Sequence, residues 1–385
     1  MRITFFSNFF NFHQLPLANE FQAMNDVEYT FVSLLSTEGM VGRTSLDNEY
    51  SFVLREYEGE TSAGLAMKHA VEDEIVVFGD MTSKEQYVRA RAETGKPFFR
   101  YAERLLKRGD WWRFVPVKAY RTWDRFGRYK NCDMRVLCAS AYTARDLGLF
   151  GFPESMCLKW GYFPQVEGRA GLAVYKTSLP RYKALCSAQR LIPLKRVDLQ
   201  IHALQRIALT EPNVRLTIAG DGPERKKLEN LAVELGVSGN VAFLGECSHD
   251  DVLDLMCESG IFLATSDRHE GWGATINEAM SMGCCIIASE EMGSVPYLIK
   301  DGTNGLSFRR GDFVVASDKI SQALSDADFA RRLGAEAKKT VDGTWSAKEA
   351  AVRFAELAKY VSYGKGTDFA GFRPWPDGPL SSAGV

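Results

Sequence analysis

A regular alternation of short apolar runs with amphipathic segments, between residues 184 and 289, most constrains the fold of this chain. The apolar runs are predicted strands at 184–191, 214–220, 240–245, 261–266 and 284–289. The segments between them are predicted helices at 197–209, 223–235 and 250–260. Such alternation builds a doubly wound parallel sheet, whose ligands bind at the carboxyl ends of the strands.

The first half of the chain shows the same alternation less regularly. Its candidate strands are 2–10, 28–35, 50–57, 74–80 and 134–140, and 85–95 is a candidate crossover helix. Residues 38–60 give no clear pattern, and the irregular stretch 154–181 is where we expect the connection between two domains. A length of 385 residues agrees with two or three domains. The sequence therefore predicts two α/β domains.

Composition excludes some classes of protein. The formal net charge of −2 argues against nucleic-acid binding by the whole protein. The eight cysteines form no C-x-x-C pair and no metal-ligand spacing, so we expect reduced thiols. The N-terminal apolar run is broken by Ser7, Asn8 and Asn11, which favours a first strand over a signal peptide. No window approaches the roughly 20 apolar residues of a membrane span. We expect a cytoplasmic protein, at most bound to the inner face of the cytoplasmic membrane.

Residues 100–130 stand apart because basic and aromatic side chains are interleaved there. Ten basic residues against three acidic ones give this segment a net charge of +7. Pro116 can open a helix, on which Lys118, Arg121, Arg125 and Arg128 would share one face. Such helices occur at anionic membrane surfaces. The other interpretations are a solvated basic face with aromatics packed inward, an anionic acceptor, and nucleic acid.

Two carboxylates flank the loop between the strand 261–266 and the next predicted helix. Glu270 and Glu278 are separated by a segment that holds Gly271, Gly273 and Ala274. A loop closing on a helix N-terminus leaves free N–H groups that suit phosphate. Carboxylates beside it can accept hydrogen bonds from sugar hydroxyls, so the stretch suits a nucleotide-sugar. Solvated surface charges are the alternative.

Two further strand-end loops carry suitable residues. Arg190 and Lys195 follow the strand 184–191 and can neutralise a diphosphate, or they are ordinary surface charges. The turn GDGP at 220–223 approaches the dinucleotide pattern G-x-G-x-x-G, but Arg225 stands at the third glycine position. That departure makes nicotinamide binding a poor interpretation. His13, after the first strand, is a candidate general base or acceptor contact, although a lone histidine is more often structural.

These motifs, in this order, resemble glycosyltransferase family 4, whose members are retaining enzymes of the GT-B fold. The motifs are R-x-x-P-x-K (190–195), GDGP (220–223), VAFLGE (241–246), E-x7-E (270–278) and DGTNGLSF (301–308). The likeness is close over about residues 184–310, and the segments SNFFNFHQLPL and KWGYFP look similar to members of the bacterial surface-polysaccharide type.

The resemblance implies an α/β fold of two Rossmann-like, doubly wound parallel-sheet domains that face a cleft. We expect an acceptor-side domain at 1–168 and a nucleotide-sugar-binding domain at 169–345. A C-terminal helix and tail at 346–385 would pack back toward the first domain.

Residue roles follow from the same resemblance. Arg190 and Lys195 would hold the diphosphate and stabilise the departing nucleotide, and Glu270 would contact the donor sugar; these, with His13, are the predicted catalytic residues. The predicted donor-binding residues are Glu278 for the ribose, Gly273, Ala274 and Thr275 for phosphate or sugar, Gly220 and Asp221 at the turn, and Leu244 and Cys247 for the base. The leaving diphosphate would take the acceptor proton, so no protein nucleophile is required.

The sequence therefore predicts a retaining transferase of a hexose-type sugar in polysaccharide biosynthesis. Its donor would be a UDP-, GDP-, dTDP- or ADP-sugar, with no cofactor and no metal, because Arg and Lys replace the metal on the diphosphate. Its acceptor would be a glycan or lipid-linked glycan, with peripheral membrane contact through residues 100–130 and no nucleic acid. The alternatives are a GT-B-like nucleotide-sugar epimerase and a non-catalytic nucleotide-sugar-binding subunit.

Overall fold

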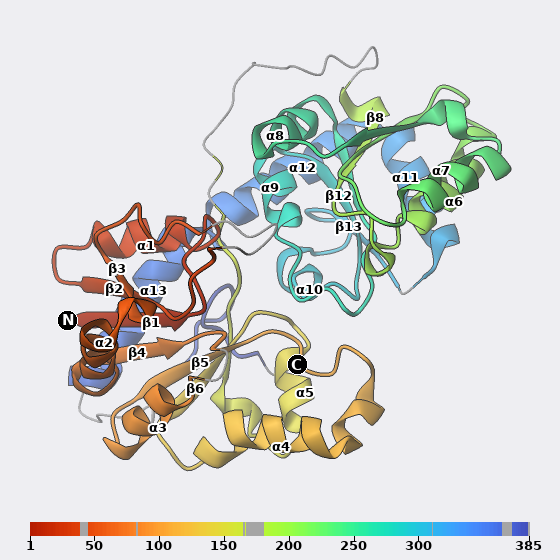
Figure 1. Ribbon diagram of the computed structural model, residues 1–385. Helices are drawn as coiled ribbons and strands as arrows, with labels where there is room; N and C mark the ends of the chain where they lie inside the picture. Colours follow the sequence, from red (N-terminus) through yellow and green to blue (C-terminus); the bar gives the residue numbers. More distant parts are fainter. Residues whose placement is uncertain are drawn as a thin grey trace. The chain divides into compact units, whose positions relative to one another are not determined.

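A computed structural model describes residues 1–38, 45–81, 84–164, 166, 181–309, 311–363 and 372–383. The chain divides into two compact units (Figure 1). Unit 1 comprises Met1–Pro164 and Trp345–Val385, and unit 2 comprises Gln165–Thr344. The predicted boundaries were 168/169 and 345/346.

Within the described part of unit 1, seven strands form one sheet, all paired in parallel. Their order across the sheet is β3 (Val53–Arg55), β2 (Glu28–Ser33), β1 (Arg2–Ser7), β4 (Ile75–Phe78), β5 (Phe98–Ala102), β6 (Met134–Cys138) and β7 (Cys157–Lys159). Chain order reverses between β1 and β4, which is the topological switch point of a doubly wound sheet.

Adjacent aromatic residues on the strands of unit 1 bury against opposite layers of helices. The helices of this unit are α1 (Leu15–Gln22), α2 (Glu60–Glu72), α3 (Gln86–Glu93), α4 (Pro116–Arg125), α5 (Thr143–Gly148) and α13 (Ala347–Tyr363). Phe6 packs with Tyr87 of α3, whereas Phe5 packs with Phe21 of α1 and Phe354 of α13. This alternation follows from the two-residue period of a strand.

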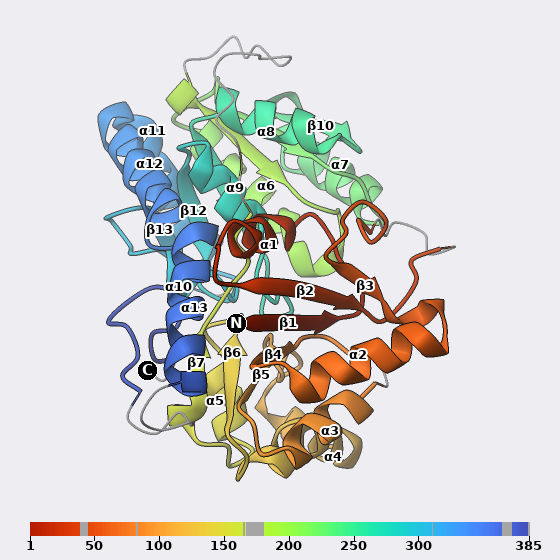
Figure 2. The same ribbon diagram turned by 90° about the vertical axis from the view of Figure 1, so that its left-hand side faces the viewer.

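The C-terminal segment completes unit 1, as the predicted fold required. Helix α13 lies beside α1 (Figure 2), and Phe354 contacts Phe5, Phe21, Phe99 and Trp160. Beyond it, the tail pairs with β7: the N–H of Leu380 donates to the carbonyl of Lys159 at 2.8 Å. One layer of the unit 1 core is thus supplied from the far end of the chain.

Unit 2 contains a six-stranded sheet in its described residues, again parallel throughout. The strand order is β10 (Val241–Gly245), β9 (Arg215–Ala219), β8 (Ala184–Ala188), β11 (Ile261–Ala264), β12 (Cys285–Ser289) and β13 (Leu306–Phe308). The helices are α6 (Val197–Ala208), α7 (Arg225–Glu234), α8 (His249–Glu258), α9 (Thr275–Ser281), α10 (Val295–Leu298), α11 (Phe313–Ser325) and α12 (Ala327–Asp342). The switch point lies between β8 and β11.

The elements predicted for unit 2 all occur, with ends that differ by at most three residues, whereas unit 1 required corrections. Strand β5 was missed because Phe98–Ala102 runs into the basic segment that began at residue 100. Strand β7 was missed in the irregular stretch 154–181, and the first strand ends at Ser7 rather than at residue 10.

The basic helix was predicted too long. Helix α4 begins at Pro116 as expected but ends at Arg125, and Arg128 lies in the 3₁₀ turn Gly127–Tyr129 beyond it. The 3–4–3 spacing of its cations therefore does not continue as one helical face through Arg128. None of the helices among the described residues has both the length and the apolar content to cross a bilayer.

Replacing Phe354 by Ala should destabilise unit 1 by about 3–5 kcal/mol, because it leaves a cavity among four aromatic partners. Differential scanning calorimetry should show a lower transition temperature for unit 1 and an unchanged one for unit 2. Val352→Ala, at a position 37% exposed on the same helix, is the control and should cost less than about 1 kcal/mol. Equal effects of the two substitutions would contradict this account of α13.

Candidate functional site

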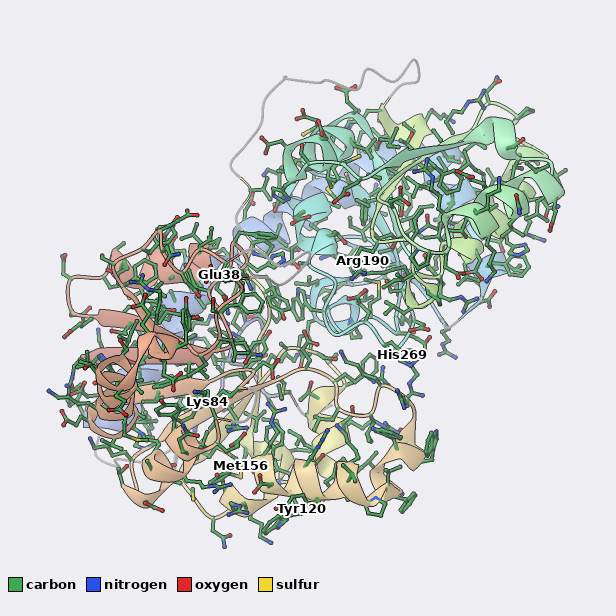
Figure 3. All side chains as sticks on the ribbon, viewed as in Figure 1. Glu38, Lys84, Tyr120, Met156, Arg190 and His269 are labelled. Carbon is green, nitrogen blue, oxygen red and sulfur yellow. The ribbon has the colours of Figure 1, made fainter. Side chains whose placement is uncertain are left out.

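The predicted donor-site residues of unit 2 gather at the switch point of its sheet. Arg190 and Lys195 lie in the loop that follows β8, and Glu270 lies in the loop that follows β11. Because β8 and β11 are neighbours and parallel, their carboxyl ends open at the same edge. Figure 3 shows Arg190 on its loop.

Backbone hydrogen bonds join the loop after β8 to the turn after β9. The N–H of Leu191 donates to the carbonyl of Asp221 at 2.8 Å, and the N–H of Glu224 donates to the carbonyl of Leu191 at 3.0 Å. On the other side, the N–H of Gly220 donates to the carbonyl of Gly245 at 2.7 Å. The GDGP turn and the residue after it therefore hold the backbone at Leu191, next to Arg190, and the turn is itself tied to the end of β10.

This approach requires glycine at position 220. Its φ is +125°, and a Cβ there would lie 2.0 Å from the carbonyl oxygen of Gln189. Arg225, at the third position of the glycine pattern, bonds instead to Asp221 (2.8 Å), Glu229 (3.0 Å) and the carbonyl of Phe243 (3.3 Å). Asp221 was predicted to contact the nucleotide-sugar, but its carboxylate is held by the N–H of Gly222 and by Arg225. These two hydrogen bonds keep the pKa of Asp221 below the ordinary value.

Lys195 and Glu270 form an ion pair that joins the two switch-point loops. The backbone around the pair is also fixed. The N–H of Asp267 donates to the carbonyl of Leu194 at 2.8 Å, and the hydroxyl of Thr265 donates to the carbonyl of Lys195 at 2.9 Å. The two predicted catalytic side chains are thus held together, each about one-sixth to one-fifth exposed (16% and 19%).

Unlike the ammonium group of Lys195, the guanidinium group of Arg190 is not paired with a carboxylate of any described residue. Its side chain is exposed and makes no hydrogen bond or ion pair with any residue that the structure describes. An uncompensated guanidinium on a fixed backbone is available to an incoming anion.

The loop after Glu270 presents free backbone donors. Within the described chain, the N–H groups of Gly273, Ala274 and Thr275 donate to no protein acceptor, because they precede or open helix α9. Gly273 has φ +90°, a backbone conformation that favours glycine, whereas the 2.5 Å contact of a Cβ there would be with the flexible end of the Met292 side chain. These are the donors that the sequence predicted at the loop–helix junction.

Trp272 anchors this loop and was not singled out from the sequence. It is buried, its indole N–H donates to Asn277 Oδ1 at 2.8 Å, and its carbonyl accepts from the hydroxyl of Ser294 at 2.7 Å. A large aromatic residue between two glycines was the available signal, because such a side chain needs a core to enter.

Glu278 is a buried carboxyl group in the first turn of α9. Burial raises its pKa from 4.5 to about 7. Its carboxyl group has no hydrogen-bond donor among the residues described, and the imidazole Nδ1 of His249 lies 4.0 Å from its Oε1. A buried acceptor without donors suits hydroxyl groups of a ligand.

The predicted base-pocket residues lie at the end of β10. Strand pairing with β9 shifts between Phe243 and Gly245, so Leu244 is the extra residue of a β-bulge. The Sγ of Cys247 contacts the carbonyl of Gly245 at 3.5 Å. Both residues therefore neighbour the GDGP turn through Gly245.

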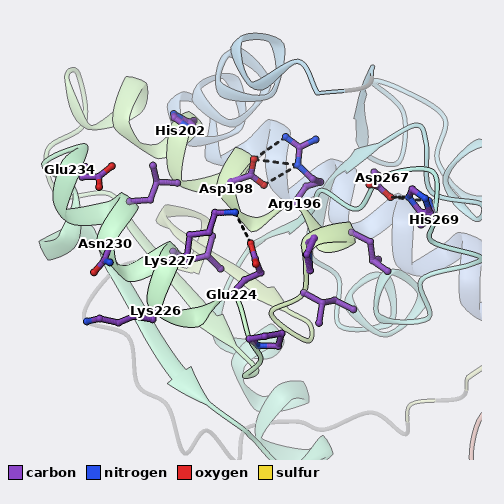
Figure 4. A pocket seen from close by; sticks show the side chains of 16 residues that line it. Arg196, Asp198, His202, Glu224, Lys226, Lys227, Asn230, Glu234, Asp267 and His269 are labelled. Atoms are coloured by element: carbon purple, nitrogen blue, oxygen red, sulfur yellow. Dashed lines mark hydrogen bonds and ion pairs between the residues drawn. The ribbon is translucent and has the colours of Figure 1, made fainter. Parts of the chain in front are cut away.

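A groove of about 1260 Å³ lies beside these loops, along α6 and α7 (Figure 4). Its lining includes Leu194 and Arg196 from the β8 loop, and Asp267 and His269 from the β11 loop. It includes none of the predicted catalytic residues. It is therefore a neighbour of the candidate site rather than the site itself.

His13 lies in unit 1, in the loop between β1 and α1 at that sheet's own switch point. Its N–H donates to Asn11 Oδ1 at 3.0 Å, and its ring lies 4.1 Å from that of Phe12. The structure therefore places His13 at the carboxyl edge of this sheet, and its catalytic role stays a prediction. In the described parts of both units, no cluster of three or more His, Cys, Asp or Glu side chains could hold a metal ion.

Comparisons with known proteins agree with this geometry. Residues 176–340 match the model of the family described as glycosyl transferases group 1. N-acetyl-alpha-D-glucosaminyl L-malate synthase of Bacillus anthracis is 32% identical over 148 residues, covering 38% of this chain and 38% of that protein. Lipopolysaccharide core biosynthesis glycosyltransferase LpsE of Rhizobium meliloti (strain 1021) is 32% identical over 160 residues, covering 42% of this chain and 45% of that protein. The chain thus matches less than half the length of these relatives.

Solved structures match over most of the chain. Anabaena Alr3699/HepE in complex with UDP has a TM-score of 0.67 at 16% identity, covering 93% of this chain and 99% of that one. The lipopolysaccharide outer core galactosyltransferase WaaB has a TM-score of 0.63 at 17% identity, covering 93% and 100%. These likenesses confirm the predicted two-domain α/β fold class.

Gly220→Ala should destabilise unit 2 by at least about 2 kcal/mol, because its Cβ would overlap the Gln189 carbonyl on which the loop depends. Thermal unfolding measures the effect. Gly239→Ala is the matched control, since its Cβ would meet no atom within 4 Å and its backbone conformation is ordinary. A Gly220→Ala protein as stable as this control would contradict the role given to the turn.

Glu278→Gln should stabilise the ligand-free protein at high pH. A folded-state pKa raised from 4.5 to about 7 means that the ionised carboxylate costs stability, little below pH 4.5 and fully above pH 7. The substitution should therefore raise the free energy of unfolding by up to about 3 kcal/mol at about pH 8. At about pH 4.5 it should leave the free energy of unfolding nearly unchanged. Denaturant titrations at both pH values measure the difference, and a benefit of equal size at both would contradict the burial argument.

Proposed function

We propose that this chain, whose residues 176–340 form a domain of the glycosyl transferases group 1 family, transfers a hexose-type sugar from a nucleotide-diphosphate sugar to a glycan or lipid-linked glycan. The transfer would proceed with retention of anomeric configuration, in polysaccharide biosynthesis. The observation that carries the proposal is a set of groups at the switch point of unit 2: the paired Lys195 and Glu270, together with an Arg190 side chain and the N–H groups of Gly273 to Thr275, which have no partner among the described residues.

The diphosphate would bind first through the groups that have no protein partner. Arg190 supplies a planar fork for two oxygens, and the N–H groups at the start of α9 supply further donors. Lys195 is already paired with Glu270, so an incoming diphosphate competes with that carboxylate for the ammonium group. The ion pair therefore keeps Lys195 in place before the donor arrives, at a position where it can then neutralise phosphate.

The hydroxyl groups of the donor would bind to the two glutamates. Once the diphosphate attracts Lys195, the Glu270 carboxylate has free acceptor positions for the sugar next to the reacting bond. Glu278, buried and without donors among the described residues, would accept from the ribose. Gly220, Asp221, Leu244 and Cys247 would border the nucleoside, since they meet at Gly245.

The chemistry would need no protein nucleophile. The bond between the anomeric carbon and the diphosphate oxygen breaks, and the developing negative charge is stabilised by Arg190 and Lys195. The acceptor hydroxyl forms the new bond on the same face and passes its proton to the leaving diphosphate. Two cationic side chains perform here the neutralisation that a metal ion performs elsewhere, so we propose a metal-independent reaction without a cofactor.

The acceptor would be bound by unit 1, where His13 would contact the reacting hydroxyl from the β1 loop. Two similarities support a glycan or lipid-linked glycan as acceptor. One relative is named for lipopolysaccharide core biosynthesis, and one structural neighbour is a lipopolysaccharide outer core galactosyltransferase. An acceptor held at a membrane would also explain the composition of residues 100–130.

Arg190→Ala and Lys195→Ala should each lower the rate of transfer roughly hundredfold or more, because each removes charge from the leaving diphosphate. Glu270→Gln should also abolish most activity while the protein stays folded. Release of nucleoside diphosphate from UDP-, GDP-, dTDP- and ADP-sugars in the presence of acceptor glycans measures the rate. Arg331→Ala, an exposed position on α12, is the control and should keep full activity.

The donor base is identified by thermal shift, since a bound nucleotide raises the melting temperature by mass action. One of the four nucleotides should stabilise the wild-type protein, and Arg190→Ala should reduce that stabilisation. Nuclear magnetic resonance of the product reports the anomeric configuration. Full transfer activity in Arg190→Ala and Lys195→Ala would refute the site assignment, and an inverted product would refute retention.

A further inference from the structure

Large apolar side chains line the outer side of the 3₁₀ turn Asp110–Phe114 and of α4. They recur at every third residue and form what we call the aromatic ridge: Trp111 (59% exposed), Phe114 (72%), Val117 (60%), Tyr120 (61%) and Trp123 (51%). Figure 3 shows Tyr120 on the outer side of α4. A three-residue repeat is aligned in a 3₁₀ turn and stays on one side of a short helix.

The ridge is not needed for the core of unit 1. Of the ten residues of α4, only Thr122 is buried. The rings of Tyr120 and Trp123 lie 6.2 Å apart, so the exposed apolar surface is continuous between them. A patch of this kind on a soluble unit marks a contact with another apolar phase.

Cationic side chains border the ridge. The Arg113 guanidinium lies 4.7 Å from the centre of the Phe114 ring, and that of Arg128 lies 5.0 Å from Trp123. Arg121 is exposed on α4 and has no ion-pair partner among the described residues. Residues 100–130 carry ten basic against three acidic side chains, a net charge of +7. The occupant of the ridge should therefore combine apolar and anionic groups.

The cations predicted to make the contact are only partly available for it. Burial lowers the pKa of both Lys118 and Arg125, and Arg125 Nε lies 3.9 Å from the carboxylate of Glu85. Arg128 is paired with Asp124 at 2.6 Å. On the outer side of α4, the side chains available for contact are therefore mainly the apolar ones of the ridge, rather than a row of charged lysine and arginine groups.

A small cavity of mixed polar and apolar lining adjoins the end of the ridge. Its volume is about 110 Å³, and Trp123 of the ridge lines it together with Phe126, Leu147, Phe150 and Phe152. Lys130, which is exposed, belongs to the same lining.

We propose that the aromatic ridge inserts into the interfacial layer of an anionic lipid bilayer, with Arg113 and Arg121 on the lipid phosphates. Tryptophan, tyrosine and phenylalanine are the side chains that favour this layer, and cations add attraction to anionic lipids. The inference deepens the proposed function, on which it rests for its purpose, because it places unit 1 where a lipid-linked acceptor lies. The membrane contact itself does not depend on the donor site.

Co-sedimentation of the full chain with vesicles tests the proposal. Wild-type protein should bind vesicles of phosphatidylglycerol and phosphatidylcholine, and bind pure phosphatidylcholine more weakly. The double substitution Trp111→Ser with Phe114→Ser should lower the partition coefficient more than about tenfold, and Tyr120→Ser alone should lower it severalfold. Because apolar insertion persists in salt, binding should weaken but survive at about 0.5 M NaCl.

Tyr363→Ser is the matched control, since Tyr363 is 64% exposed on α13 of the same unit, outside the ridge. It should bind vesicles like the wild type. Absent wild-type binding, unchanged binding by both ridge variants, or an equal loss in the control would overturn the proposal. Lipid-free dimerisation that the ridge variants abolish would overturn it in favour of a second copy of this chain.

The nucleotide thermal shift separates this proposal from the donor assignment. Ridge variants should keep the full nucleotide-induced rise in melting temperature, which also shows that they are folded. A wild-type protein that binds vesicles but responds to no nucleotide would refute the proposed function and leave the ridge proposal standing.

Discussion

The backbone contact between the β8 loop and the GDGP turn is the constraint on which the candidate site depends. Without a side chain at Gly220, the two loops approach closely enough for Leu191 and Asp221 to share a hydrogen bond. That bond fixes the backbone next to Arg190. Lys195 lies five residues further along the same loop, where it pairs with Glu270. In the proposed function, a rigid backbone between the two cations would let them neutralise a diphosphate without moving the chain at each turnover.

The fold of unit 2 could be predicted because its central strands β8, β11 and β12 are buried on both faces and its helices show clear boundaries. Pro223 and Gly236, for example, bracket the segment that contains α7. Strand β5 escaped prediction because its buried Arg100, paired with Glu85, looks in sequence like one more surface cation. The composition of a short sequence segment does not show whether Arg100 is solvated or paired in the core, because its partner Glu85 lies fifteen residues away in the sequence.

At the candidate site, the sequence located the charged residues but not what positions them. The spacing of Glu270 and Glu278 predicted a loop–helix junction, and α9 begins there. The anchoring of Trp272 by Asn277 and Ser294, and the approach of His249 to Glu278, depend on contacts between separate elements. Arg225 shows the same limit: a residue that only spoils a motif in sequence fixes Asp221 in space.

The position of α13 has a consequence for the synthesis of the protein. Unit 2 is an insertion within unit 1, because the residues before it form the sheet of unit 1 and the residues after it supply helix α13 to a layer that covers this sheet. As the chain leaves the ribosome, Phe5 of β1 and Phe99 of β5 stay uncovered until Phe354 has been synthesised and can pack against them. Unit 2 can fold in that interval, since domains fold as units in order of synthesis. During that interval the aromatic face of the first sheet is exposed, and this is the stage of synthesis at which a chaperone would be needed.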